Sequence, residues 1–259
     1  MSTDGFVPDP NPEQVVSGGN DTGVTAQRGE GVPSEMRDIR HDHVPTEGSM
    51  STPDRTLIRM SQVRRGLGIL GGTFDPPHIG HLAAAVEVRS ALHLERVLLM
   101  VANEPWQKAG NRPLSAPQDR FDLTSASVGD LEGIEASSLE IDRGGPTYSI
   151  DTLHQLKEIA PDQQLFLIVG SDAALNLHTW HRHEELPGLA TLVIVERDGD
   201  RNAEPPAGWS VERVSMPRLD ISSSDMRERV RDGRPLNPFV VPDVINEINA
   251  RGLYGFTDS

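Results

Sequence analysis

The 259-residue sequence predicts an α/β protein with a doubly wound parallel sheet, preceded by a disordered N-terminal tail. Two observations predict the sheet. Four short, almost wholly apolar runs are typical of strands buried on both faces, and helical patterns lie between them. This alternation favours a parallel sheet with right-handed crossovers. In such a sheet a ligand binds beyond the carboxyl ends of the strands. A change of composition near residue 62 predicts the tail.

Residues 1–62 are predicted to be disordered. Phe6 is their only aromatic residue, and six prolines and seven glycines interrupt any periodicity. Such a segment buries too little apolar surface to offset the entropy of ordering it. A partner-binding tail, an extension without a role and a start at Met50 or Met60 all remain open. The remaining residues, 63–259, are enough for one domain.

The expected elements follow directly from the apolar patterns. Strands are expected over residues 67–70, 97–101, 165–169 and 192–195. Helices are expected over residues 81–94, 117–128 and 149–159. Ser115 is the expected cap of the second helix, and the third has a clear amphipathic stripe. The closing segment, residues 239–254, is expected to pack rather than to take part in chemistry.

Charge and composition exclude several classes of protein. Lys and Arg total 24 against 39 Asp and Glu, and the formal net charge of −15 argues against a protein that covers nucleic acid. The chain has no cysteine. This excludes disulfides, thiolate catalysis and Cys-based zinc sites. No apolar run approaches the roughly 20 residues of a membrane span, and the N-terminus lacks signal-peptide features. A cytoplasmic protein is therefore expected, and a homo-oligomer is left open.

The acidity lies only partly in the tail. Residues 1–60 hold 10 of the acidic and 5 of the basic residues, so the rest of the chain keeps a net charge of −10. If the domain binds anions, its positive potential must therefore be concentrated in one place.

Twelve residues after the first predicted strand carry the strongest motif, which reads Gly71-Gly72-Thr73-Phe74-Asp75-Pro76-Pro77-His78-Ile79-Gly80-His81-Leu82. The glycine pair lets the backbone turn sharply and approach a ligand. His78 and His81 lie three residues apart across a helix start, so both imidazoles can face the anion-binding end of that helix. Gly80 leaves the approach open. Half of a metal site is the alternative, but no third ligand at suitable spacing completes it.

This motif resembles that of the nucleotidyltransferase superfamily, which shares His-x-Gly-His with class I aminoacyl-tRNA synthetases. Its Gly-Gly-Thr-Phe-Asp-Pro form is similar to the nicotinate-nucleotide adenylyltransferase family, and the resemblance runs from about residue 67 to 254. It implies a Rossmann-like fold and transfer of the AMP moiety of ATP to nicotinate mononucleotide, giving deamido-NAD and pyrophosphate in NAD biosynthesis. It also implies catalytic roles for His78 and His81, and ATP binding by Gly71, Gly72, Thr73, Phe74 and Gly80.

The segment 221–227 resembles the family's Ile-Ser-Ser-Thr-x-x-Arg motif. Ser222, Ser223 and Ser224 can cap a helix and leave N–H groups and hydroxyls facing an anion. One turn further, Arg227 can fork onto phosphate oxygens. An ordinary cap with a surface arginine would also explain this segment alone. Together with the two histidines, the resemblance implies an ATP triphosphate clamp.

The segment 144–153 is similar to the family's Gly-Pro-Ser-Tyr-Thr-x-x-Thr-Leu. It begins a helix whose first backbone N–H groups are unsatisfied and can receive a carboxylate. An ordinary capped helix start is the alternative. The resemblance implies that the nicotinate carboxylate is bound, partly through backbone, by Thr147, Tyr148, Ser149 and Ile150.

Two further substrate contacts are expected after the strand at 165–169. Asp172 follows that strand's carboxyl end, where it can accept ribose hydroxyls. The resemblance implies that Trp180 stacks on the pyridine ring, for which an indole is a suitable flat partner. A packing role for Trp180 is the alternative.

The segment 101–108 corresponds to a loop that reads Pro-x-x-x-Pro-x-His-Lys in many family members. Lys108 is retained and is expected to neutralise the reacting phosphates. Val101 and Gln107 depart from the usual Pro and His, which bears on the loop's conformation more than on activity.

The chemistry implied by these residues needs no covalent enzyme intermediate. The mononucleotide phosphate attacks the α-phosphorus of ATP, and the enzyme positions the two anions and neutralises the leaving group. Mg²⁺ is expected to bridge ATP phosphate oxygens. Nicotinamide mononucleotide or phosphopantetheine as acceptor, a cytidylyltransferase, and a catalytically silent nucleotide-binding module remain alternatives.

Overall fold

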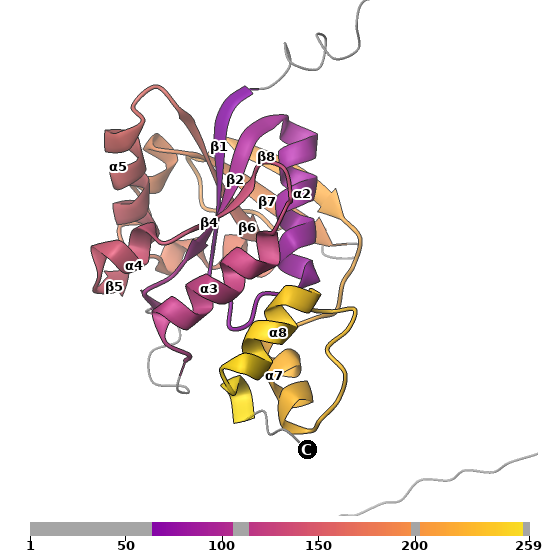
Figure 1. The fold of residues 1–259 in the computed structure, drawn as a ribbon. Coiled ribbons are helices and arrows are strands. Elements are labelled where there is room, and N and C mark those ends of the chain that lie inside the picture. The colour runs from indigo at the N-terminus through magenta and orange to yellow at the C-terminus, as the bar shows by residue number, and fades with distance from the viewer. Residues whose placement is uncertain (1–63, 106–113, 198–202, 256–259) are drawn as a thin grey trace, which may run out of the picture. The chain divides into compact units, whose positions relative to one another are not determined.

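A computed structural model of the chain describes residues 64–105, 114–197 and 203–255. The predicted tail, residues 1–62, lies outside the described residues. Figure 1 shows a central sheet with helices on both faces, followed by two C-terminal helices, α7 and α8, beside α3. Among the described residues, no helix is long and apolar enough to cross a bilayer.

The strands are β1 (Arg64–Gly72), β2 (Leu94–Val101), β3 (Glu104–Pro105), β4 (Ile134–Ser137), β5 (Pro146–Thr147), β6 (Gln164–Gly170), β7 (Thr191–Arg197) and β8 (Val211–Met216). The helices are α2 (Ile79–Leu92), α3 (Pro117–Val128), α4 (Leu139–Arg143), α5 (Ser149–Ile159), α6 (Ser171–Leu175), α7 (Ser223–Arg231) and α8 (Pro242–Ala250). The 3-10 turns are η2 (Leu177–Thr179), η3 (Leu186–Gly188) and η4 (Leu253–Gly255).

The main sheet confirms the doubly wound prediction. Six strands lie in the order β4-β2-β1-β6-β7-β8, and each neighbouring pair is parallel. Numbered within this sheet alone, the order is 3-2-1-4-5-6, which reverses direction between β1 and β6. A ligand crevice is expected at that reversal, outside the carboxyl ends of the two strands. The short strands β3 and β5 pair separately, also in parallel.

All four predicted strands are present as β1, β2, β6 and β7. Their apolar side chains are buried on both faces of the sheet, because successive strand residues point to opposite sides. Leu67 and Ile69 of β1 pack on the side of α5, whereas Leu99 and Val101 of β2 pack on the side of α2. The sequence analysis did not predict β4 and β8, the two edge strands.

Two of the predicted helices have their predicted limits. These are α3 and α5. The first predicted helix was placed too far along the chain, because α2 begins at Ile79 and ends at Leu92. His93 then takes a positive φ of 52°, and Leu94 already begins β2. Such a left-handed residue ends a helix.

The expected cap of α3 is wrong. Ala116 occupies the N-cap position, and Pro117 follows as the first helical residue. A proline suits that place because its missing N–H would have no intrahelical partner there. The carbonyl of Ser115 instead accepts a hydrogen bond from Arg120.

The C-terminal helices form a third, smaller core with α3. Leu123 of α3, Met226 of α7 and Ile248 of α8 are all completely buried in it. This confirms the packing expected for the closing segment. The segment also reaches the first motif, because the Tyr254 hydroxyl donates to the Asp75 carboxylate at 2.8 Å.

Candidate active site

Two cavities open at the carboxyl edge of the sheet, where β1 and β6 part. We call the cavity on the side of α5 cavity A, of about 300 Å³, and the one on the side of α2 and α7 cavity B, of about 390 Å³. They share Leu70 of β1 and Val169 and Gly170 of β6 in their walls. The ligand crevice predicted by the strand order is therefore a pair of adjoining compartments.

The two histidines of the first motif line cavity B together. Their rings stack with centroids 3.8 Å apart. The backbone N–H of His78 donates to Nδ1 of His81 at 3.2 Å. Because that nitrogen is an acceptor, a neutral His81 ring carries its hydrogen on Nε2, which can act as a donor.

His78 is the more buried of the pair and is 7% exposed. Burial, and then the positive charge of Arg197, lower the pKa of His78 from 6.5 to about 4. The ring is thus neutral near pH 7. Its Nδ1 atom is buried without a hydrogen-bond partner among the described residues. A Cβ at position 80 would lie 3.1 Å from the His78 ring, a tight contact that would displace the ring.

The predicted serine-rich motif forms the opposite wall of cavity B. Ser222 caps α7 by accepting the Asp225 backbone N–H at 3.1 Å. The Ser223 hydroxyl donates to the Pro76 carbonyl at 2.8 Å, so this hydrogen is directed to the chain and not to the cavity.

Arg227 also holds α7 to the first motif. Its guanidinium donates to the Asp75 carbonyl at 2.6 Å and to Ser224 Oγ at 2.8 Å. The two segments predicted to form one clamp are therefore brought together across about 150 positions of sequence, and Ser222, Ser223 and Arg227 all line cavity B.

One charged residue of cavity B was missed by the sequence analysis. Arg197, the last residue of β7, lines the cavity and bears on the pKa of His78. A cation just beyond a predicted strand was a usable signal for it. Ser224 also lines the cavity, and its oxygen accepts from Arg227.

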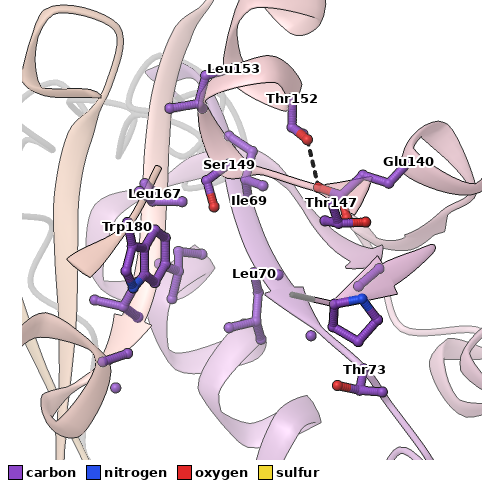
Figure 2. A pocket seen from close by; sticks show the side chains of 18 residues that line it. Ile69, Leu70, Thr73, Glu140, Thr147, Ser149, Thr152, Leu153, Leu167 and Trp180 are labelled. Carbon is purple, nitrogen blue, oxygen red and sulfur yellow. Dashed lines mark hydrogen bonds between the residues drawn. The ribbon is translucent and has the colours of Figure 1, made fainter. Parts of the chain in front are cut away.

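Cavity A contains three of the predicted mononucleotide contacts, namely Thr147, Ser149 and Trp180. In Figure 2 Trp180 lies on one side of the cavity, across from Thr147. The Trp180 Nε1 atom is buried and has no hydrogen-bond partner in the described part of the chain. A buried donor without an acceptor is costly, and a ligand atom could satisfy it.

The strand-end glycines leave cavity A open. A Cβ on Gly71 or Gly170 would meet no atom within 4 Å. Gly71, Gly72 and Thr73, which were predicted for ATP, line cavity A and are not in the wall of cavity B. Phe74 lines neither cavity. Its ring lies over Gly72, where an added Cβ would come within 2.7 Å, and edge-on to His81.

The other predicted residues that the structure describes line neither cavity. Ile150 is buried in the core, and the Tyr148 ring lies against His181 at 4.3 Å. Asp172 is exposed on α6 and remains a prediction. Lys108 and Gln107 lie outside the described residues.

A buried carboxylate in cavity A was also missed. Glu140 of α4 is 5% exposed and lines the cavity beside Thr152, whose hydroxyl donates to Glu140 Oε1 at 2.6 Å (Figure 2). Burial raises the pKa of Glu140, against the opposing effects of this hydrogen bond and of Arg143. No motif distinguished this glutamate from surface glutamates.

The arrangement suits two anionic or polar ligands held against each other. Cavity B offers imidazoles, the hydroxyl-rich start of α7 and two arginines, which together suit a polyphosphate. Cavity A offers an indole and small polar groups, which suit a flat aromatic ring with polar substituents. Their common wall places the inner ends of such ligands side by side.

Comparisons with known proteins show the family of the chain. A family profile described as cytidylyltransferase-like matches residues 69–229. A protein of Acidothermus cellulolyticus named "probable nicotinate-nucleotide adenylyltransferase" is 43% identical over 208 residues, which cover 77% of this chain and 99% of that protein. A protein of the same name from Corynebacterium kroppenstedtii is 43% identical over 192 residues, covering 73% and 90%.

The fold also matches a solved structure. Nicotinic acid mononucleotide adenylyltransferase of Plasmodium falciparum, complexed with NaAD, superposes with a TM-score of 0.62. The match covers 74% of this chain and 98% of that one. Because the sequence identity is only 20%, this match shows a similarity of fold alone.

Proposed function

The chain belongs to the cytidylyltransferase-like family, among the nicotinate-nucleotide adenylyltransferases, and on this premise we propose that it transfers the AMP moiety of ATP to nicotinate mononucleotide. The products are deamido-NAD and pyrophosphate, so the reaction belongs to NAD biosynthesis. One observation carries the assignment of substrates to sites: cavities A and B share a wall at Leu70, Val169 and Gly170.

ATP occupies cavity B in this proposal. His78 and His81 donate to its phosphates, and Arg227 neutralises the β- and γ-phosphate groups. The neutral imidazole of His78 suits this task, because it supplies a directed N–H. Arg197 adds charge from the β7 side. Ser222 contributes mainly by capping α7, whose first N–H groups then face the phosphates.

Nicotinate mononucleotide occupies cavity A. Its pyridine ring lies against Trp180, and its carboxylate meets Thr147, Ser149 and the unsatisfied N–H groups at the start of α5. Tyr148 and Ile150 contribute through their backbone, since neither side chain lines the cavity. Gly71 gives the substrate room at the strand end.

The reaction is a single in-line displacement. An oxygen of the mononucleotide phosphate forms a bond to the α-phosphorus of ATP, while the bond from that phosphorus to the bridging oxygen breaks. The electron pair leaves with pyrophosphate, whose charge Arg227 and the helix start offset. Lys108, three residues after Pro105 of the cavity A wall, is proposed to neutralise the reacting phosphates.

Mg²⁺ is proposed to enter bound to ATP. The residues that line cavity B include no carboxylate, and no cluster of three or more potential metal ligands occurs among the described residues. This donor set fits an ion that keeps its waters and is held by substrate phosphates. When bound, it supplies further neutralisation of the leaving pyrophosphate.

The direct test is pyrophosphate release by the purified chain from Mg-ATP with nicotinate mononucleotide, and in parallel with nicotinamide mononucleotide. We expect release with the acid form, matched by an equal amount of dinucleotide on mass spectrometry. No release with either acceptor would overturn the proposal and favour a binding module. A strong preference for the amide form would show that carboxylate recognition at α5 is wrong.

A further inference from the structure

Arg120 of α3 is a charged side chain buried where no predicted role required one. Only 1% of its surface is exposed. Its guanidinium donates through Nη1 to the carbonyls of Thr73 at 3.0 Å and Ala102 at 2.6 Å. It also donates through Nη2 to Asn103 at 2.9 Å and through Nε to Ser115 at 3.0 Å. One side chain thus joins the loops after β1 and β2 to the start of α3.

Such a residue is costly for packing alone. Burial lowers the pKa of Arg120, and the nearby negative charge of Asp75 works against that shift. An arginine remains protonated in proteins, so its desolvated charge must be offset by well-placed acceptors. An apolar side chain of similar volume would fill the space without this requirement. The specific gain from a guanidinium is the fixed position of its carbonyl partners.

These carbonyl partners build one wall of cavity A. Thr73 and Ala102 line the cavity. The Asn103 backbone N–H donates to Thr147 Oγ1 at 3.0 Å, and its side chain donates to the Gly145 carbonyl at 2.9 Å. Through Asn103, Arg120 therefore sets the loop that precedes α5. None of its four acceptors lines cavity B.

We propose that Arg120 is a positioning residue for the mononucleotide. It sets the distance between the loop after β2 and the start of α5. The inference rests on the proposed function, which assigns cavity A to that substrate. It predicts that a change at Arg120 weakens binding in cavity A and spares ATP binding in cavity B.

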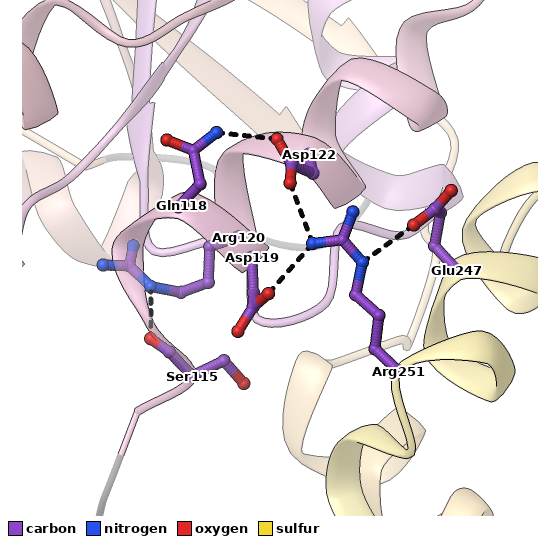
Figure 3. Close-up of polar contacts among 7 residues, drawn as sticks. All are labelled: Ser115, Gln118, Asp119, Arg120, Asp122, Glu247 and Arg251. Atoms are coloured by element: carbon purple, nitrogen blue, oxygen red, sulfur yellow. Dashed lines mark hydrogen bonds and ion pairs between the residues drawn. The ribbon is translucent and has the colours of Figure 1, made fainter.

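Arg251 directly follows α8 and contacts the same helix α3, so it provides a matched control. It donates through Nη1 to Asp119 at 2.9 Å and Asp122 at 2.8 Å, and through Nε to Glu247 at 2.8 Å. Figure 3 shows the two guanidiniums around α3, with Arg120 by Ser115 and Arg251 by the half-buried acids. Loss of Arg251 loosens the contact of α3 with α8 and removes no hydrogen bond of the cavity A wall.

The experiment compares the steady-state KM for each substrate in the wild-type chain, Arg120→Lys and Arg251→Met. A lysine keeps the charge but cannot present the planar fork, so we expect KM for nicotinate mononucleotide to rise about 10-fold or more. KM for ATP should change less than about twofold in the same variant. Arg251→Met should lower the melting temperature and leave both KM values unchanged.

If Arg120→Lys fails to fold, Arg120→Ala with added methylguanidine takes its place, and recovery of mononucleotide affinity by calorimetry is expected. Equal changes in both KM values, or the same KM pattern in Arg251→Met, would reduce Arg120 to a structural residue and overturn the inference. An unchanged KM for the mononucleotide in an active Arg120→Lys enzyme overturns the inference and leaves the proposed function standing. A wild-type chain without adenylyl transfer overturns the proposed function, and the inference with it.

Discussion

Cavities A and B adjoin at one strand edge, yet they are built from different materials. Cavity B brings the histidines at the start of α2 and the start of α7 to the ends of the strands, and Ser223 and Arg227 hold these two segments together through the carbonyls of Pro76 and Asp75. Cavity A is lined by strand-end glycines, apolar side chains, small polar groups and one indole. The difference teaches that a polyphosphate site needs donors from distant segments, whereas a flat ring needs mainly shape.

The titratable groups of the two cavities sharpen this comparison. Burial is the main cause of the pKa shift in both, but it lowers the pKa of His78 and raises the pKa of Glu140. Both groups are moved toward their neutral form, because desolvation penalises either charge. The fixed positive charge of cavity B therefore resides in its arginines and not in His78.

The largest expected effect is a loss of activity when a histidine of cavity B is removed. In His81→Ala we expect kcat to fall about 100- to 1,000-fold, the usual cost of removing one positioned donor. The variant should still melt cooperatively, although the contacts of His81 with the His78 N–H and with the His78 and Phe74 rings are lost. The measurement is pyrophosphate release, with His178→Ala as the control because His178 is exposed and lines neither cavity. Full activity in His81→Ala would remove the histidines from the ATP site.

The next largest effect is a rise in KM when the indole of cavity A is removed. Trp180→Ala should raise KM for nicotinate mononucleotide about 10-fold or more, because stacking on an aromatic side chain contributes about 1–3 kcal/mol. Trp180→Phe should recover most of this affinity, and KM for ATP should stay constant in both variants. A rise in KM for ATP alone would mean that the two cavities have been assigned to the wrong substrates.

A third prediction concerns stability between pH 7 and pH 5 in cavity B. Because the pKa of His78 is lowered in the folded state, the unfolded chain binds more protons below pH 6.5, and stability falls as the pH falls toward 4. The share from His78 is about 2 kcal/mol between pH 7 and pH 5. Chemical denaturation of wild type and His78→Gln at both pH values measures it. Parallel pH dependences in the two proteins would contradict the burial of this ring.

The smallest effect has the opposite sign and belongs to cavity A. The pKa of Glu140 is raised, so its contribution to stability is greatest at low pH and is lost as the pH rises through the folded-state pKa. Glu140→Gln keeps an acceptor for Thr152 and removes the buried charge. We expect the variant to gain stability at pH 7 relative to pH 4, because the buried charge is removed. The same denaturation series tests this, and a loss at pH 7 would assign the carboxylate a favourable interaction there.

The centre of the sheet could be predicted from the sequence, whereas its edges could not. The run at 165–169 is apolar throughout because β6 is covered on both faces. Val214 and Met216 of β8 are buried while Ser215 between them is exposed, so that strand shows no continuous apolar run. Edge strands with one covered face resemble loops in a sequence of this composition.

The two halves of the clamp were predictable because each carries a local motif. The Arg120 network was not, because its acceptors are backbone carbonyls and leave no trace in residue identity. An arginine in the first turns of a helix usually indicates a solvated face. The expected Ser115 cap failed at the same place, where that residue serves Arg120 through its carbonyl.

The wall shared by the two cavities has a consequence for turnover. A dinucleotide made across Leu70 and Gly170 is a bivalent ligand, with one half in each compartment. While either half stays bound, the covalent link keeps the other at high effective concentration near its own site. Pyrophosphate has no such tether and can leave from cavity B alone. With the substrates placed as proposed, we therefore expect the dinucleotide, which must vacate both compartments together, to leave more slowly than pyrophosphate.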